Sequence, residues 1–307
     1  MSSRPLAFVL MSQRSGTSAL VHTLNEHPGA AVGIERYKYL WPDWPEQYDP
    51  ALFEAERFFA LDESETNILG SRRWETYYRR KVAGFGPGTL SGDKVQPITR
   101  AMVRGILERS PGARFLYPFR SLLPLASSYA VRAANPEDEN WDENRGALAG
   151  LQVWRRDNQA VLELLDDPEL AAHVLPVSYE DFFQGDPVTV SAVLDHVGLG
   201  PDEAFEQAVA DNAERYSEVQ GKQLALTYEE VEQLLPHVRD PAFVRLLDLA
   251  PSQPRPPQSV MVDPSEVDRL RRKVAFLTDQ LERLRSRRSV RAALGVADQL
   301  GRLRPGR

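Results

Sequence analysis

The sequence predicts an α/β protein whose parallel strands form a doubly wound sheet flanked by helices. Three short apolar runs, at residues 6–11, 113–119 and 174–178, have the length of buried strands, and each precedes a longer stretch with a helical pattern. Strands that alternate with helices in this way form parallel βαβ units. Ligands of such sheets bind beyond the carboxyl ends of the strands, so candidate site residues are sought there.

Each element has its own signal along the chain. Leu6 to Met11 is a continuous apolar run, which predicts a buried strand, and the following helix begins near Thr17. Pro118 disfavours a central place for the strand at 113–119 unless the proline lies at the strand's end. The predicted strands are 6–11, 30–34, 113–119 and 174–178, and the predicted helices are 17–26, 122–134, 145–165, 188–197 and one from about 227.

Composition and charge bound the classes of function. The chain has 307 residues, of which 42% are apolar; this is enough for one large core or two modest ones and excludes disorder as the main state. Its 37 Lys and Arg against 44 Asp and Glu give a net charge of −7. A nucleic-acid binder needs a basic face to neutralise phosphates, so no nucleic-acid partner is expected.

Several kinds of site are also excluded by residue content. The chain contains no cysteine, which rules out disulfides, Cys-ligated zinc, iron–sulfur clusters and a thiol nucleophile. Its five histidines are scattered without the spacing of metal ligands, so no metal is expected. The apolar run from Leu6 to Met11 is too short for a signal-peptide core or a membrane span. A cytoplasmic location fits best, although a lack of cysteine also suits a secreted protein.

Three segments are expected: an α/β domain at 1–250, a proline-rich linker at 251–263 and a basic amphipathic helical tail at 264–307. The tail carries 12 Lys and Arg against 5 Asp and Glu, so its formal charge is +7 and residues 1–263 carry −14. Its apolar residues follow heptad spacing at Val267, Leu270, Val274, Leu277, Leu281 and Leu284. This pattern predicts a short coiled coil that forms a homo-oligomer, with peripheral membrane contact or packing onto the domain as alternatives.

The stretch after the first strand predicts an anion-binding loop, formed by Arg14, Ser15, Gly16, Thr17 and Ser18. A buried strand that passes through a tight glycine turn into a helix directs backbone N–H groups and the positive helix end at one point. The loop is not a Walker A motif, because it lacks the leading glycine and the lysine after Gly16. An ordinary strand–turn–helix with Ser15 or Thr17 as N-cap is the alternative.

These residues, with the His-Pro pair at 27–28, resemble the 5′-phosphosulfate loop of sulfotransferases that use 3′-phosphoadenosine 5′-phosphosulfate (PAPS). The resemblance covers about residues 5–200 and implies a P-loop-like parallel sheet and PAPS as co-substrate. Arg120, at a strand end, and Ser128, eight residues later, match the family's 3′-phosphate ligands. Tyr179, in a Tyr-Glu-Asp segment, would lie near the adenine or the 3′-phosphate. The family's acidic residue and proline after the arginine are replaced here by serine and leucine.

The resemblance also implies the chemistry of transfer. Relatives that act on sugars tend to place a glutamate at the end of the second strand, where this chain has Glu35, and we expect Glu35 to be the general base. Gly-Asp-Lys at 92–94 resembles an acidic-Lys element of carbohydrate sulfotransferases, so Lys94 is expected to orient Glu35 or contact the transferring group. The alternatives are a Glu35 paired with Arg36 and a plain surface Lys94.

The expected function is transfer of a sulfuryl group from PAPS to an acceptor hydroxyl on a small molecule, sugar or glycolipid, with 3′-phosphoadenosine 5′-phosphate (PAP) as product. A P-loop-type nucleotide kinase, a non-catalytic nucleotide-binding module and a scaffold that acts through the tail are the alternatives. Residues 36–93 and 130–145 should form the acceptor walls. Their aromatic residues suit substrate contact or core packing equally: Tyr37, Tyr39, Trp41, Trp44, Tyr48, Trp74, Tyr77, Tyr78 and Trp141.

Overall fold

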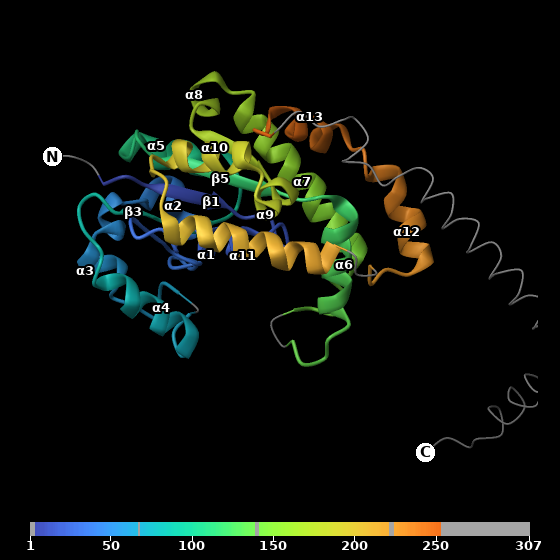
Figure 1. Ribbon diagram of the computed structural model, residues 1–307, viewed down its shortest axis with the longest axis horizontal. Coiled ribbons are helices and arrows are strands. Elements are labelled where there is room, and N and C mark those ends of the chain that lie inside the picture. The colour runs from blue at the N-terminus through green and yellow to red at the C-terminus, as the bar shows by residue number, and fades with distance from the viewer. Residues whose placement is uncertain (1–3, 67, 139–140, 221–223, 253–307) are drawn as a thin grey trace, which may run out of the picture. The chain divides into compact units, whose positions relative to one another are not determined.

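Strand β1 (Ala7–Leu10) lies inside a parallel sheet, and all four of its residues are buried. A computed structural model of the chain describes residues 4–66, 68–138, 141–220 and 224–252 (Figure 1). Strand β1 pairs with β4 (Lys94–Val95) on one side and with β5 (Arg114–Phe119) on the other, and β6 (Val174–Ser178) pairs with β5. All of these pairs are parallel, so the predicted α/β class with a parallel sheet flanked by helices is confirmed.

A second pair of strands joins the sheet through β4. Strand β2 (Ala30–Val32) pairs in parallel with β3 (Leu90–Gly92), and β3 continues through Asp93 into β4. A bridge from Leu6 to Ser91 and a hydrogen bond of 3.0 Å from Val9 N to Asp93 O tie this segment to β1. The segment β3–β4 therefore lies between β2 and β1.

The sequence analysis did not predict β3 and β4, because polar residues and a glycine interrupt the apolar pattern there. The structure nevertheless buries Ser91, Asp93 and Lys94. Gly92 lets the segment pass very close to β1, since a Cβ at this position would lie 1.7 Å from Ala7 O.

Helices cover both faces of the sheet, because side chains alternate between the faces along each strand. Ala7 and Val9 pack against a first layer of helices, and Phe8 and Leu10 pack against a second layer. The first layer is α1 (Thr17–Leu24), α9 (Tyr179–Gln184), α10 (Pro187–Val197) and α11 (Glu203–Gln220). The second layer includes α2 (Trp44–Gln47), α5 (Arg100–Arg109), α6 (Leu122–Ala133), α7 (Ala147–Leu165) and α13 (Pro241–Leu249).

Shorter and peripheral elements complete the described part of the chain. They are η1 (Trp41–Asp43), η2 (Pro50–Phe53), α3 (Ala55–Phe58), α4 (Arg72–Val82), α8 (Pro168–Ala171), α12 (Tyr228–Leu234) and η3 (Leu235–His237). Pro118 is the next-to-last residue of β5, opposite Val177 of β6, so the proline sits near the strand's end as the sequence required.

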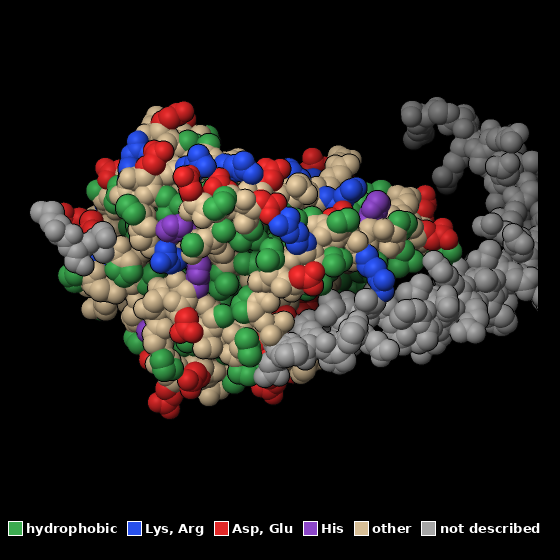
Figure 2. Space-filling model, turned by 90° about the horizontal axis from the view of Figure 1, so that it is seen from above, with side chains coloured by type: hydrophobic (Ala, Val, Ile, Leu, Met, Phe, Trp, Pro, Cys, Tyr) green, Lys and Arg blue, Asp and Glu red, His purple; other side chains and the backbone are tan. Residues whose placement is uncertain are grey.

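The segments predicted after the domain lie mostly outside the described residues. Only the first two residues of the linker at 251–263 are described, and the tail at 264–307, with its heptad pattern, is not. Within the described ranges, no helix is both long and apolar enough to cross a membrane. On the face drawn in Figure 2, acidic and basic side chains are interspersed rather than gathered by sign.

Candidate functional site

The loop between β1 and α1 has the backbone of an anion-binding turn. Arg14 has a φ of 67° and Gly16 a φ of 88°, both in the left-handed region. Turns of this kind align successive backbone N–H groups, and here they lead into the positive end of α1. Gly16 is the N-cap of α1 and provides no side-chain cap, so the predicted alternative of a Ser15 or Thr17 cap is wrong. The first N–H groups of the helix thus receive no hydrogen bond from an N-cap side chain.

Ser15 and Thr17 of the loop are buried, whereas Arg14 and Ser18 are at least partly exposed. Ser15 is buried, and its hydroxyl donates a hydrogen bond of 2.7 Å to Ser12 O, so this side chain holds the turn together. Thr17 is also buried, at the start of α1. Arg14 is exposed at the tip of the turn. Ser18 lies one residue further along α1, and its hydroxyl accepts a hydrogen bond of 3.0 Å from Lys94 Nζ.

Gly16 makes room for an aromatic ring as well as for a turn. A Cβ at this position would lie 2.3 Å from Cδ2 of Tyr179, the first residue of α9. The same ring also contacts Arg120, whose guanidinium carbon lies 4.3 Å from the ring centroid. Tyr179 therefore links the loop after β1 to the end of β5, as expected for residues that follow the carboxyl ends of neighbouring strands.

Arg120 and Ser128, the residues predicted to bind a 3′-phosphate, both lie beside the loop. Arg120 Nη1 donates to Arg14 O at 3.3 Å, and Arg14 Nε donates to Ser128 Oγ at 2.8 Å. The peptide of Arg120 is held by Trp154, whose Nε1 donates to Arg120 O at 2.7 Å. Ser121, which replaces the family's acidic residue, donates its backbone N–H to Glu180 Oε1 at 3.0 Å. The departure from the family motif thus leaves this strand end well held.

The two arginines lack a direct ion-pair partner among the described residues. Neither Arg14 nor Arg120 forms an ion pair with a described residue, and Arg120 Nε is buried without a hydrogen-bond partner there. Partial burial and the nearby guanidinium groups of Arg132 and Arg120 lower the pKa of Arg14. Crowded cations with an unused buried donor fit an anionic ligand with more than one phosphate or sulfate group.

Glu35 and Lys94 form an ion pair next to the loop. Lys94 Nζ lies 2.8 Å from Glu35 Oε1, and Lys38 Nζ lies 3.4 Å from Glu35 Oε2. The Lys94 side chain is only 5% exposed, so the alternative of a plain surface lysine is wrong. Burial raises the pKa of Glu35, but the ion pairs with Lys94 and Lys38 outweigh burial and hold this pKa below its ordinary value. Glu35 is therefore ionised at neutral pH.

Asp93 is a residue of the site to which the sequence analysis gave no role. Its fully buried carboxylate accepts three backbone N–H groups: those of Arg36 at 3.0 Å, Tyr37 at 3.0 Å and Lys94 at 2.8 Å. Glu35 directly precedes two of these residues and has a φ of 58°, in the left-handed region. Asp93 therefore fixes the turn that presents Glu35. Burial raises the pKa of Asp93 to about 6. The Gly-Asp-Lys string was the signal that could have found it.

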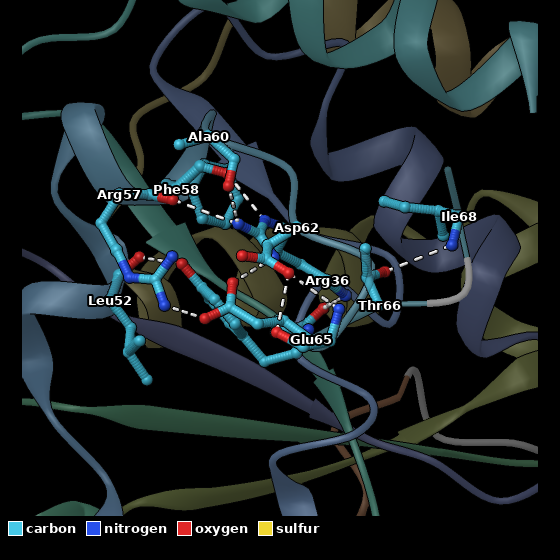
Figure 3. A network of polar contacts seen from close by, with 12 residues as sticks. Arg36, Leu52, Arg57, Phe58, Ala60, Asp62, Glu65, Thr66 and Ile68 are labelled. Atoms are coloured by element: carbon cyan, nitrogen blue, oxygen red, sulfur yellow. Dashed lines mark hydrogen bonds and ion pairs between the residues drawn. The ribbon is translucent and has the colours of Figure 1, made fainter. Parts of the chain in front are cut away.

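Arg36 serves the structure behind this turn, and it does not pair with Glu35 as the alternative interpretation held. Its fully buried guanidinium forms an ion pair of 3.1 Å with Glu65 and donates to the carbonyl oxygens of Arg57, Phe58 and Ala60 (Figure 3). Arg57 also pairs with Glu65. This network ties the end of β2 to residues 57–65. Glu35 therefore pairs with the two lysines described above and not with Arg36.

Most of the aromatic residues expected at the acceptor walls belong to the core instead. Six are buried: Tyr37, Trp41, Trp44, Tyr48, Tyr77 and Tyr78. Tyr39 is 51% exposed. Trp74 stacks on His22, with 5.3 Å between the ring centroids. The sequence left both substrate contact and core packing open, and for those six residues the structure shows core packing.

No group of three or more His, Asp or Glu that could hold a metal lies within the described ranges. His27, near the loop in sequence, contacts the backbone: its Nδ1 accepts from Gly29 N at 2.9 Å and its Nε2 lies 3.1 Å from Gly200 O. Two surface hollows, of about 270 and 330 Å³, are lined neither by the loop nor by Arg120 or Glu35, whereas Tyr78, from the expected acceptor walls, lines the larger one.

Comparison with known proteins adds a likeness of fold. No family model and no curated protein sequence matches the chain. Among solved structures, a sulfotransferase from Alicyclobacillus acidocaldarius matches at 19% identity over 80% of this chain and 95% of its own, with a TM-score of 0.49. The sulfotransferase STF9 from Mycobacterium avium matches at 12% identity over 81% and 77%, with a TM-score of 0.44. Mouse sulfotransferase SULT7A1, solved with PAP, matches at 12% identity over 80% and 85%, with a TM-score of 0.42. Similarities at this level carry no conclusion about function.

Proposed function

We propose that this chain is a PAPS-dependent sulfotransferase that acts on an acceptor hydroxyl of a carbohydrate or glycolipid. One observation carries the proposal: the loop at residues 14–18 contacts both Arg120 and Lys94, Arg14 and Arg120 form no ion pair with a described residue, and Lys94 pairs with an ionised glutamate. The site has a cationic half, formed by the loop with Arg120, and an acceptor half, formed by the ion pair of Glu35 and Lys94. Ser18 connects them, because it lies in the first turn of α1 and accepts a hydrogen bond from Lys94.

The cationic half fits a nucleotide with two anionic ends. Arg14 and the N–H groups of the loop and α1 would hold the 5′-phosphosulfate, and residues 15–18 form that turn. Arg120 and Ser128 would hold the 3′-phosphate, and the buried, unpartnered Nε of Arg120 is the donor that a phosphate oxygen would use. Tyr179, which packs between Gly16 and Arg120, would stand beside the adenine or the 3′-phosphate.

The other half fits the acceptor. When bound, PAPS supplies the sulfuryl group and leaves as PAP. Glu35 is placed to accept the acceptor's hydroxyl proton as the hydroxyl oxygen bonds to sulfur and the bond from sulfur to the phosphate oxygen breaks. Its depressed pKa keeps it ionised, and therefore able to accept a proton, at neutral pH. Lys94 orients this carboxylate and adds positive charge beside the loop.

The base also bears on the acceptor class. Glu35 follows the second strand, the location at which the sequence resemblance places the glutamate of sugar-modifying relatives. His27, the histidine nearest the loop in sequence, has both ring nitrogens in contact with backbone groups. A glutamate base therefore supports a carbohydrate or glycolipid acceptor over the phenols and steroids on which histidine-dependent relatives act.

Two variants test the proposal in a screen of radiolabelled PAPS against glycans, glycolipids and phenols. Glu35→Gln should retain PAP affinity and lose sulfuryl transfer by roughly 100-fold or more, the usual contribution of a general base. The control is Glu169→Gln, which removes an exposed glutamate on α8 that pairs with Arg104 on the surface. Full turnover in Glu35→Gln would refute the assignment of the base. Binding of ATP only with magnesium, and no binding of PAP, would favour the kinase alternative.

A further inference from the structure

A third arginine lies beside the loop between β1 and α1, and the proposed function gives it no role. Arg145 comes two residues before α7, and its guanidinium donates a hydrogen bond from Nη2 to Oε1 of Gln13. Gln13 directly precedes Arg14 in the loop. The same oxygen of Gln13 accepts a hydrogen bond of 3.3 Å from the hydroxyl of Tyr129, on α6. Arg145 is therefore linked through one side chain to the turn that would hold the phosphosulfate.

The position of Arg145 is fixed on its other side by Trp141. The indole Nε1 of Trp141 donates to Arg145 O at 3.1 Å, and Arg145 N donates to Asp142 O at 2.9 Å, which closes the turn. The guanidinium carbon of Arg145 lies 4.5 Å from the centroid of the Trp141 ring. A half-buried arginine held by an amide oxygen and an aromatic ring is oriented in advance, so little side-chain entropy remains to be lost when it binds a ligand.

The charge of Arg145 has no acidic partner among the described residues. Its neighbour on the same ring, Arg132, forms an ion pair with Asp138, at 2.5 Å from Nε to Oδ2. Arg145 forms hydrogen bonds and a ring contact but no ion pair with a described residue. Among the described residues, this partly desolvated cation therefore has no counter-charge, which is unfavourable unless an anion completes it. Arg14 and Arg120 already match the two anionic ends of the nucleotide, which leaves Arg145 for a third anionic group.

We propose that Arg145 binds an acidic group of the acceptor, and that the acceptor is a sugar that carries a carboxylate. This inference rests on the proposed function. An anionic acceptor must approach an anionic co-substrate, and a cation next to the loop offsets that repulsion. The planar fork of Arg145 matches the two oxygens of a carboxylate, so it selects an acidic sugar over its neutral counterpart.

A matched pair of acceptors tests this selection: 4-nitrophenyl β-D-glucuronide and 4-nitrophenyl β-D-glucoside, which differ by the carboxylate. In calorimetric titrations of the PAP-saturated protein, the glucuronide should bind about 10-fold or more tightly than the glucoside, as one charge-assisted contact predicts. Arg145→Gln should bring this ratio to about 1, and Arg145→Lys should keep part of it because the charge remains. Arg155→Gln, an exposed arginine paired with Asp240, is the control and should keep the full ratio.

The other outcomes separate this inference from the proposed function. Equal binding of the two sugars by the wild-type protein, or an unchanged ratio in Arg145→Gln, overturns the inference. A loss of PAP affinity in Arg145→Gln overturns it as well, because the arginine would then belong to the nucleotide site. If PAP does not bind at all, the proposed function fails. The titration without PAP then decides, and glucuronide binding that is lost in Arg145→Gln still supports an acidic-sugar site.

Discussion

Arg120→Ala should weaken PAP binding only through the 3′-phosphate. The side chain contacts the loop through Arg14 O at 3.3 Å and covers the ring of Tyr179 at 4.3 Å, while its buried Nε has no described partner. A phosphate that takes this donor would gain a hydrogen bond to a charged group, worth about 1.5–3 kcal/mol. The expected loss in the variant is therefore roughly 10- to 150-fold in PAP affinity.

The assay is a ligand cycle by calorimetry. PAP and adenosine 5′-monophosphate, which lacks the 3′-phosphate, are each titrated into the wild-type protein and into Arg120→Ala. Because the arginine acts on the 3′-phosphate alone, the affinity for the monophosphate should change by less than about 2-fold, which is the margin within which independent effects usually add. Arg245→Ala, which removes an exposed arginine paired with Asp166, is the control and should leave both affinities unchanged.

The loss of this side chain should also lower the folding stability of the protein, which is measured separately. Removal of the ring contact with Tyr179 should cost about 0.5–1 kcal/mol of folding stability, so the melting temperature reports folding separately from binding. Equal losses for both nucleotides would place Arg120 elsewhere in the site, and no loss for either would refute the 3′-phosphate assignment.

Three further predictions follow from the site. Burial raises the pKa of Asp93 to about 6, above that of an unfolded aspartate, so the native state binds a proton more readily than the unfolded state. As the pH falls from 7 to 5, the free energy of unfolding measured by urea titration should therefore rise by on the order of 1 kcal/mol. Asp93→Asn should abolish this rise and lower kcat with little change in KM, and a rise of the same size in the variant would refute the link. Lys94→Met should raise the pKa of Glu35, because the first ion-pair partner is lost while burial remains, so the acidic limb of the kcat profile should move to higher pH; an unmoved limb would contradict the pairing. Deletion of residues 259–307, which hold the predicted heptads, should leave PAP affinity unchanged and lower the oligomeric state in sedimentation; a loss of PAP binding would show that the tail belongs to the site.

Residues that follow strand ends were the ones that could be predicted from the sequence. Arg14, Arg120 and Tyr179 each follow an apolar run that proved to be a strand, and parallel strands bring their carboxyl ends to one edge. Glu35 and Lys94 were expected in the same place and form an ion pair of 2.8 Å. Periodicity and the rule for parallel sheets indicated the strand ends, whereas the choice of Glu35 and Lys94 depended on the sequence resemblance.

The rest depended on contacts that no local pattern contains. Asp93 lies between β3 and β4, two strands that the apolar pattern did not reveal, and its role follows from the passage of this segment between β2 and β1. Arg145 reaches Gln13 only because the turn before α7 folds back toward the loop. The sequence also does not show which way a side chain points within a tight turn. Ser15 belongs to the predicted loop, but its hydroxyl donates a hydrogen bond to Ser12 O.

The most direct test of the account is a calorimetric titration of the protein with PAP, with and without magnesium, beside the same titrations with ATP. Arg14, Arg120, Ser128 and the N–H groups at the start of α1 need no metal to bind phosphate. PAP should therefore bind equally well in both conditions, and far more tightly than ATP, which lacks the 3′-phosphate. Magnesium-dependent binding of ATP, with no binding of PAP, would contradict the account.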